Sequence, residues 1–257
     1  MKMPANYAHY RFGKQVLPNL PADVRQCIQR FRRMYDLGLF GPDFFFYYFP
    51  FLKTETRALG GVFHRQSGQE FFTGACKAAG SEAARAYLYG LLGHYCLDSV
   101  CHPYINQLSQ IEEAKHVPLE SEFERLLLVM DQVSQPHLHD MSGKAKPTRG
   151  ECMTIAEFYP GATGAKVSIS YASMAYYIKL LVTPKRENIV RFYTRFHPSL
   201  PEYRVPVTEN EALSPYTREL LSLYEQAIAQ YPLLLAELTA HLQEGTPLSD
   251  AFFPNFG

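Results

Sequence analysis

Residues 93–104 read GHYCLDSVCHPY, and in this stretch three ionisable side chains stand among small and apolar neighbours. His94, Asp98 and His102 follow one another at intervals of four residues. Four residues make slightly more than one turn of an α-helix, so all three side chains point to one side. Imidazole and carboxylate groups together suit zinc or another first-row divalent ion. The spacing therefore predicts a helix with metal ligands along one face.

A second pair with helical spacing follows, formed by His116 and Glu120. Two ligand-bearing helical segments this close in the sequence could face each other across one metal cluster. A lone histidine is more often a hydrogen-bonded core or surface residue than a ligand. Ionisable groups on an otherwise apolar helix, however, are costly to bury unless they are paired or bound to metal. The pattern therefore favours a metal site.

Small residues precede these ligands on the same predicted helix. Ser81 is suited to cap the helix, and Ala83, Ala84, Gly90 and their neighbours would let other helices approach closely. Pro103 disfavours α geometry at the residue before it. We therefore expect the central helix to span about 81–102, to be buried, and to end there.

Other stretches place apolar side chains at helical intervals and predict an all-α fold. Neither βαβ alternation nor a convincing series of strands is present. We expect one multi-helix domain over 1–257, with the metal ligands inside 9–120 and a helical C-terminal part, 150–257, completing the core. The remaining predicted helices cover 6–17, 24–35, 120–132, 169–181, 187–196 and the stretch from 214 onward.

Asp43 lies on a turn directly before six consecutive aromatic residues, 44–49. The run lacks clean alternation and could be a short buried helix or the wall of a pocket. It could flank an apolar or base-like group of a substrate, although ordinary core is the favoured interpretation. For Asp43, a site role is favoured over the alternative of a simple turn aspartate after proline.

Composition excludes several classes of function. Lysines plus arginines equal aspartates plus glutamates, giving a formal net charge of zero, so no stable nucleic-acid partner is expected. The sequence contains no run of about 18 apolar residues, so no transmembrane segment is expected. The first residues lack the apolar region of a signal peptide, and the scattered cysteines suit a reducing compartment. We therefore expect a cytoplasmic protein.

The order of the candidate ligands resembles that of the bacterial zinc-dependent phospholipase C family, which shares its all-helical fold with the S1/P1-type nucleases. The resemblance covers about 4–130. It rests on the following residues in this order: His9, Gly41-Pro42-Asp43, His64, His94-x3-Asp98, His102 and His116-x3-Glu120.

The resemblance implies a set of zinc ligands and a reaction. Family members hydrolyse phosphodiester bonds by attack of a metal-held water on phosphorus. One zinc would be held by Asp43, His64, His94 and Asp98, a second by a histidine after Asp98 with His116 and Glu120, and a third by His9 with Asp98 bridging. We take His102 as the histidine of the second zinc and Asp43 as both a ligand and the base for the attacking water.

Two features depart from the family pattern. In the secreted enzymes, the histidine after the aspartate follows six residues later, past a proline; here position 104 is Tyr, and His102 precedes Pro103. Those enzymes also begin at a tryptophan whose terminal amine and carbonyl bind metal, and this chain contains no Trp. An ordinary α-amino group near Met1 would be a poor ligand, because it must first lose its proton. We therefore expect two firmly held zinc ions and a third that is absent or easily dialysed away.

The leading functional prediction is a zinc-dependent phosphodiesterase of the phospholipase C type, acting on a phospholipid or another phosphodiester. One alternative is a nuclease-like or small-molecule phosphoesterase on the same scaffold. Another is a metal-stabilised protein that binds a lipid or a partner without turnover. His139-Asp140 imitates the pair of an HD phosphohydrolase but falls in a polar stretch predicted to be a solvated loop, so it is discounted. No G-x-S-x-G motif is present.

Overall fold

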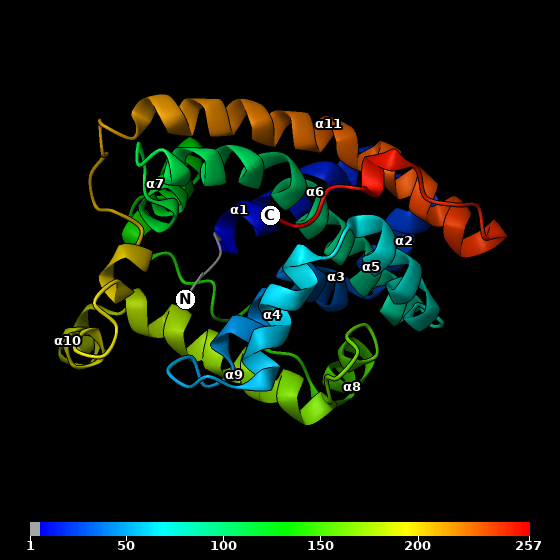
Figure 1. Cartoon of the computed structure of the whole chain (residues 1–257), viewed down its shortest axis with the longest axis horizontal. Coiled ribbons are helices and arrows are strands. Elements are labelled where there is room, and N and C mark those ends of the chain that lie inside the picture. The colour runs from blue at the N-terminus through cyan, green and yellow to red at the C-terminus, as the bar shows by residue number, and fades with distance from the viewer. Residues whose placement is uncertain (1–5) are drawn as a thin grey trace.

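The structure, a computed structural model, describes residues 6–257. Within this range the chain forms α-helices joined by loops and short 3-10 helices (η), without a strand. One isolated bridge pairs Ser67 with Asn255. The all-α prediction is confirmed (Figure 1). None of the described helices is long and apolar enough to span a bilayer.

The α-helices have the following bounds: α1 Asn6–Val16, α2 Ala22–Arg30, α3 Arg32–Gly38, α4 Glu55–Arg65, α5 Gly68–Ala75, α6 Glu82–Gln110, α7 His116–Met130, α8 Arg149–Ala156, α9 Gly164–Leu181, α10 Glu187–Thr194 and α11 Ser214–Glu244. The 3-10 helices that bear on the site are η2 Gly41–Tyr47, η6 Leu200–Tyr203 and η7 Asp250–Phe252.

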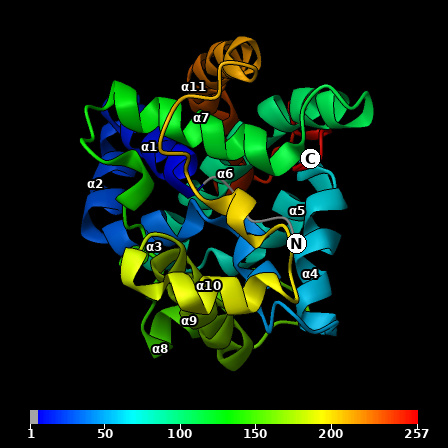
Figure 2. The ribbon, with the colours of Figure 1, turned by 90° about the vertical axis from the view of Figure 1, so that its left-hand side faces the viewer.

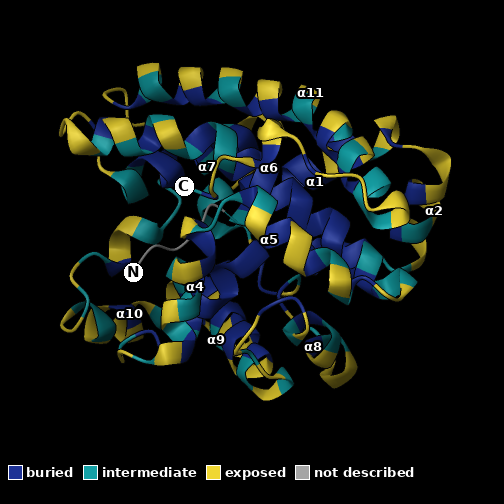
Figure 3. Cartoon of the chain, turned by 45° about the vertical axis from the view of Figure 1, so that its right-hand side comes forward, coloured by how far each residue is buried: buried dark blue, intermediate teal, exposed yellow. Residues whose placement is uncertain are grey.

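Helix α6 is the central element of the fold. Ser81 caps it by accepting a hydrogen bond from the Ala84 N–H, as its sequence predicts. Helices α1, α2, α3 and α11 all pack against it, and in Figure 3 its middle is buried while the helices around it carry the exposed residues. The buried middle follows from composition, since small and apolar residues occupy every side of this part of α6.

Two glycines bring α3 and α6 into close backbone contact. A Cβ at Gly90 in α6 would come 2.1 Å from the carbonyl oxygen of Tyr35, and one at Gly38 in α3 would come 2.2 Å from that of Tyr87. The two backbones therefore touch directly, as the small residues of α6 predicted. This contact holds α3, and the η2 segment that follows it, against the ligand-bearing helix.

The predicted end of α6 at His102 is wrong. The helix continues past Pro103 to Gln110. A proline inside a helix removes one hydrogen bond and crowds the preceding turn. Beyond it, Ile105 and Leu108 are almost completely buried, and this burial offsets the local cost. The predicted helix over 24–35 is likewise two helices, because Phe31 leaves α geometry between α2 and α3.

The aromatic run belongs to the core at its start and to the surface at its end. Phe44, Phe45 and Tyr47 in η2 are almost completely buried. Phe44 stacks on Tyr171 of α9, with ring centroids 4.5 Å apart. The core interpretation is therefore confirmed for this part of the run. Phe49 is exposed and has a positive φ of 42°, which is uncommon for a residue with a bulky side chain.

Candidate metal centre

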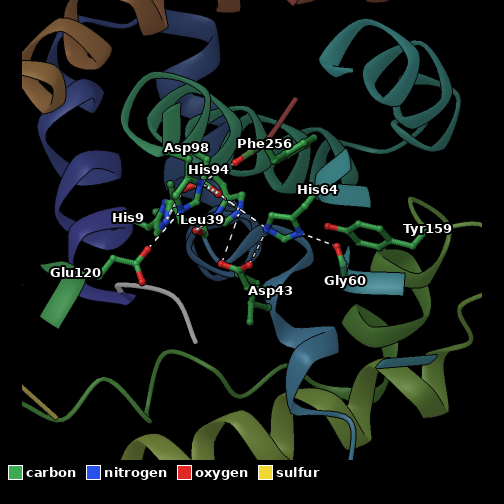
Figure 4. A network of polar contacts seen from close by, with 12 residues as sticks. His9, Leu39, Asp43, Gly60, His64, His94, Asp98, Glu120, Tyr159 and Phe256 are labelled. Atoms are coloured by element: carbon green, nitrogen blue, oxygen red, sulfur yellow. Dashed lines mark hydrogen bonds and ion pairs between the residues drawn. The ribbon is translucent and has the colours of Figure 1, made fainter. Parts of the chain in front are cut away.

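The eight predicted ligands come from five elements that converge on one side of α6. Asp98 and His94 face η2, α1 and α4 (Figure 4), while His102 lies one turn further along α6, opposite α7. The set consists of His9 from α1, Asp43 from η2, His64 from α4, His94, Asp98 and His102 from α6, and His116 and Glu120 from α7.

Asp98 lies at the middle of the group. Its Oδ1 is 3.2 Å from His9 Nε2. Its Oδ2 is 3.1 Å from His94 Nε2 and 3.5 Å from His102 Nδ1. The helical spacing therefore has the predicted effect, because the three α6 side chains share one face and other elements add to them.

Asp43 extends the group toward α4. Its Oδ1 lies 2.9 Å from His64 Nε2, and its Oδ2 lies 3.7 Å from His94 Nε2. All three side chains are buried. On the other side of Asp98, Glu120 Oε1 lies 3.3 Å from His102 Nε2 and 3.1 Å from His116 Nε2.

The donor atoms form three groups, in each of which they lie within 4.8 Å of one another. The groups are His9–His94–Asp98, Asp43–His64–His94 and His102–His116–Glu120. Within the described residues, His94 Nε2 and Asp43 Oδ2 are buried without a hydrogen-bond partner. A buried polar atom without a partner costs free energy, and a divalent cation would satisfy both. Nitrogen and carboxylate donors in this proportion fit zinc.

Backbone carbonyls orient three of the histidines. Leu39 O accepts from His94 Nδ1 at 3.2 Å, Gly60 O accepts from His64 Nδ1 at 2.6 Å, and Phe256 O accepts from His102 Nδ1 at 2.7 Å. In a neutral ring, a proton on Nδ1 leaves the lone pair on Nε2, which lies beside a carboxylate in each of the three histidines. Second-shell bonds of this kind are typical of metal-binding histidines, whose ring orientation they fix.

A family model described as zinc dependent phospholipase C matches residues 8–164. The chain belongs to this family. No curated protein and no solved structure gives a significant match to it. The matched range contains all eight converging residues and extends beyond the part in which the sequence resemblance was recognised.

In this zinc-dependent phospholipase C family member, neighbouring histidines lower the pKa values of the buried carboxylates Asp98 and Glu120. Burial alone would raise the pKa of Asp98, but His102, His94 and His9 hold that pKa well below its usual range. Burial likewise opposes ionisation of Glu120, yet hydrogen bonds from His102 and His116 lower its pKa to about 2. Both carboxylates are therefore available as ligands at neutral pH.

His102 holds a proton more tightly than an ordinary histidine. Burial disfavours its charged form, but Asp98 and Glu120 together raise its pKa to about 9. In the metal-free protein His102 is therefore protonated at neutral pH, and a cation binding there must displace this proton. The same negative field that holds the proton would attract the cation.

The segment around Phe256 is the part of this family member's centre that sequence reasoning missed. Besides its carbonyl bond to His102, Phe256 donates its backbone N–H to His64 O at 3.1 Å. Its buried ring packs 5.2 Å from Phe71 and 5.0 Å from Tyr95. One residue thus links histidines from two different helices. Any residue type can supply a carbonyl, so only the aromatic character of Phe256 could have indicated a buried segment.

Phe256→Ala is expected to destabilise the protein by about 3–5 kcal/mol, because it removes a buried ring, and to weaken zinc binding by about 10–100-fold, because the carbonyl that orients His102 loses its anchor. Thermal unfolding and competition with a zinc chelator would measure the two effects. Phe253→Ala is the matched control, since Phe253 lies in the same segment but is exposed. Unchanged zinc affinity in a folded Phe256→Ala protein would contradict the prediction.

Glu124 is a further acid close to the centre, and it is half-buried. It lies one turn beyond Glu120 on α7 and accepts a hydrogen bond from the Tyr7 N–H. Burial raises the pKa of Glu124 to about 7, despite this bond and that from Ala8. Glu120 and Glu124 line one pocket together with Tyr47 and Tyr203. Helical spacing from Glu120 was the signal that could have found Glu124.

His139 does not lie in a solvated loop as predicted. It is half-buried, its ring packs edge-on against Tyr7 at 5.0 Å, and it lines the same pocket as Glu120. Asp140 pairs instead with Lys179, its carboxylate 2.6 Å from Nζ. The two residues of the HD pair thus have separate partners, so the sequence pair has no joint role. The expectation about the amine near Met1 lies outside the described residues.

Proposed function

We propose that this protein hydrolyses phosphodiester bonds of phospholipids, with zinc held by the eight converging residues. The observation that supports the proposal most is the buried Asp98 carboxylate, which lies within 3.5 Å of three histidines from two helices. So many ionisable groups in one buried place would be costly without a cation. Membership in the zinc-dependent phospholipase C family supplies the substrate class.

The proposed ligand sets follow the three groups of donor atoms. Asp43, His64 and His94 would surround one ion, and His102, His116 and Glu120 would surround another. Asp98 lies between the two sets and also contacts His9. When bound, zinc would lower the pKa of a water molecule toward neutrality and offset the negative charge of the phosphate.

Asp43 is our candidate for the base. Its Oδ1 is engaged by His64, while its Oδ2 has no partner among the described residues. With one of its oxygens on the ion, the carboxylate would accept on the other oxygen the proton that leaves the attacking water. Because the carboxylate lies 2.9 Å from His64 Nε2 and 3.7 Å from His94 Nε2, the accepted proton would remain beside the ligands and not in bulk solvent.

The pocket beside Glu120 suits a substrate that is partly apolar. Its lining includes Met141, Ile178, Leu181 and Val205 next to the two glutamates. A phosphodiester bound at the zinc ligands could place an apolar portion against these side chains. The zero net charge of the chain supports a phospholipid over a nucleic acid.

We expect a short-chain phosphatidylcholine to be hydrolysed at least about tenfold faster than single-stranded DNA or RNA at equal phosphodiester concentration, because the pocket is partly apolar and the chain has no basic excess. The phosphomonoester products of each substrate would be separated by chromatography and quantified in parallel assays with the zinc-loaded protein. A faster reaction with nucleic acid would replace the proposal with a nuclease. If the zinc-loaded protein hydrolysed no diester, the proposal would be replaced by a metal-binding protein without catalytic activity.

We also expect about two equivalents of zinc to survive extensive dialysis. His9 has no independent ligand set, because its group shares His94 with the Asp43 group and its Asp98 also contacts His102. Its Nδ1 is buried without a partner in the described part of the chain, so no second-shell bond orients it as a ligand. Elemental analysis after dialysis would give the count. Three retained equivalents that fall to two in His9→Ala would show that His9 holds a third ion firmly.

A further inference from the structure

A cluster of exposed apolar side chains lies outside the metal centre and has no role in it. Leu52 and Phe49 in the loop after η2 are 57% and 48% exposed, and Phe192 and Phe196 at α10 are 53% and 66% exposed. We call these four residues the apolar patch. Exposed aromatic side chains gathered in one place are unusual on a soluble surface and mark an interaction site.

The patch is one surface because contacts between half-buried aromatic side chains join its two halves. Phe51, between the two exposed loop residues, stacks on Tyr193 of α10, with centroids 5.1 Å apart and planes 10° apart. Phe51 also packs edge-on against Tyr177 of α9 at 5.9 Å. The rings of Phe192 in α10 and of Phe196, two residues after the end of α10, have centroids 5.5 Å apart. In Figure 2, α10 lies on the outside of the molecule next to α9.

The loop conformation turns an apolar side chain outward. Phe49 adopts a positive φ of 42°, which costs free energy for a bulky L-residue. Pro50 next to it is buried, so the chain folds inward again directly after the exposed ring. Phe49, Leu52 and Tyr176 line one shallow groove.

Basic side chains accompany the patch. The segment from 185 to 195 contains Lys185, Arg186, Arg191 and Arg195 against a single acid, Glu187. Glu187 is itself paired with Arg204, Oε2 to Nη2 at 2.7 Å. Lys53 follows Leu52 directly and is exposed. The whole chain has zero formal net charge. The excess of basic side chains is therefore local to this part of the surface.

Shared structural elements connect the patch with the pocket of the metal centre. Tyr177 supports the patch, and the next residue of α9, Ile178, lines the pocket with Glu120. The ion pair between Glu187 and Arg204 joins α10 to the end of η6, where Tyr203 and Arg204 also line that pocket. The patch and the pocket are thus connected through α9 and through the ion pair of α10.

We propose that the apolar patch and its basic neighbours dock the protein on an anionic phospholipid surface. Exposed aromatic rings that enter the headgroup region, together with arginines and lysines that pair with anionic lipids, are the combination by which peripheral proteins bind membranes. The choice of a lipid surface over another apolar partner rests on the proposed function. Docking itself needs no turnover.

The test is co-sedimentation of the zinc-loaded protein with sucrose-loaded vesicles of phosphatidylcholine, with and without an equal amount of phosphatidylglycerol. The wild type should bind the anionic vesicles, and binding should weaken at 0.5 M salt. Phe192→Ser with Phe196→Ser should weaken partitioning by at least about tenfold. Arg191→Glu with Arg195→Glu should weaken binding to the anionic vesicles without removing an apolar group.

The matched control is Leu233→Ser with Met153→Ser, which removes two equally exposed apolar side chains from α11 and α8. This control should bind like the wild type. Circular dichroism and thermal unfolding would verify that every variant is folded. Lack of vesicle binding by the wild type, or equal binding by the patch variant, would overturn the proposal. Self-association of the wild type, lost in the patch variant and without vesicle binding, would replace the lipid with a second copy of the chain.

Turnover of a soluble chromogenic diester separates this proposal from the proposed function. With both correct, the patch variant keeps soluble turnover within about twofold and loses activity on anionic vesicles in proportion to its lost binding. Vesicle binding that depends on the patch, without turnover of any diester, would uphold docking and overturn the proposed reaction. Turnover of the soluble diester without vesicle binding would uphold the proposed reaction and overturn docking.

Discussion

Asp98→Ala is expected to remove bound zinc and phosphodiesterase activity together. The carboxylate lies between His9, His94 and His102, and no other acid within residues 6–257 contacts all three. Without it, a cation would meet an excess of nitrogen donors with less negative charge to hold it. Metal catalysis contributes several kcal/mol to such reactions, so turnover should fall by at least about 1000-fold.

Elemental analysis and turnover of a chromogenic phosphodiester would measure the two losses. His241→Ala is the matched control, because His241 lies on α11 with its Nδ1 bonded to Thr246 O and has no contact with the candidate ligands. The control should keep full zinc and full turnover. An Asp98→Ala protein with undiminished zinc and activity would show that the centre is wrongly assigned.

Gly90→Val is expected to prevent stable folding or to cost at least about 4 kcal/mol. Its Cβ alone would come 2.1 Å from the Tyr35 carbonyl oxygen and 3.0 Å from the Gly38 Cα. These are backbone atoms, so no side-chain rotation can relieve the overlap. Separating α3 from α6 would disturb the core, and effects of this size arise from such overpacking.

Denaturant unfolding would give the loss of stability. Gly74→Ala is the control, since a Cβ at Gly74 in α5 would meet no atom within 4 Å and alanine favours a helix over glycine. This control should equal or exceed the wild type in stability. Wild-type stability in Gly90→Val would mean that α3 and α6 do not touch through their glycines.

The separation of α3 from α6 should also weaken zinc binding at the metal centre. His94 lies one turn beyond Gly90, and its Nδ1 is held by the carbonyl of Leu39, which directly follows α3. If α3 moves, the ring of His94 loses its orienting bond. A Gly90→Ala protein that still folds should therefore bind zinc more weakly than Gly74→Ala.

Periodicity was sufficient to predict the ligand face of α6. His94, Asp98 and His102 lie on one helix, and helical geometry allows them only one relative arrangement. The same local argument predicted the pair His116 and Glu120. It failed at Pro103, because the preference of a residue before proline is small beside the burial of Ile105 and Leu108. The end of α6 depends on packing that acts from outside the helix.

His9, Asp43 and His64 were placed in the site by family resemblance and not by spacing. They lie on three other elements, and no local pattern states that those elements meet at α6. Their meeting depends on contacts such as that between Gly38 and Gly90. The exposed end of the aromatic run was likewise undetermined, since burial of Phe44 and exposure of Phe49 follow from the neighbours each residue finds.

Local sequence was enough to indicate the all-α class, the ligand stripe of α6 and the small residues on which close helix packing depends, because each of these follows from the chemistry of residues within a few turns. Three further features exist only in the folded chain: Phe256 bonds to His102, Leu39 and Gly60 orient His94 and His64, and the loop after η2 packs on α10. Those contacts use backbone carbonyls or join residues from distant parts of the chain. A carbonyl is the same in every residue type, and proximity across more than a hundred residues is a property of the packed fold.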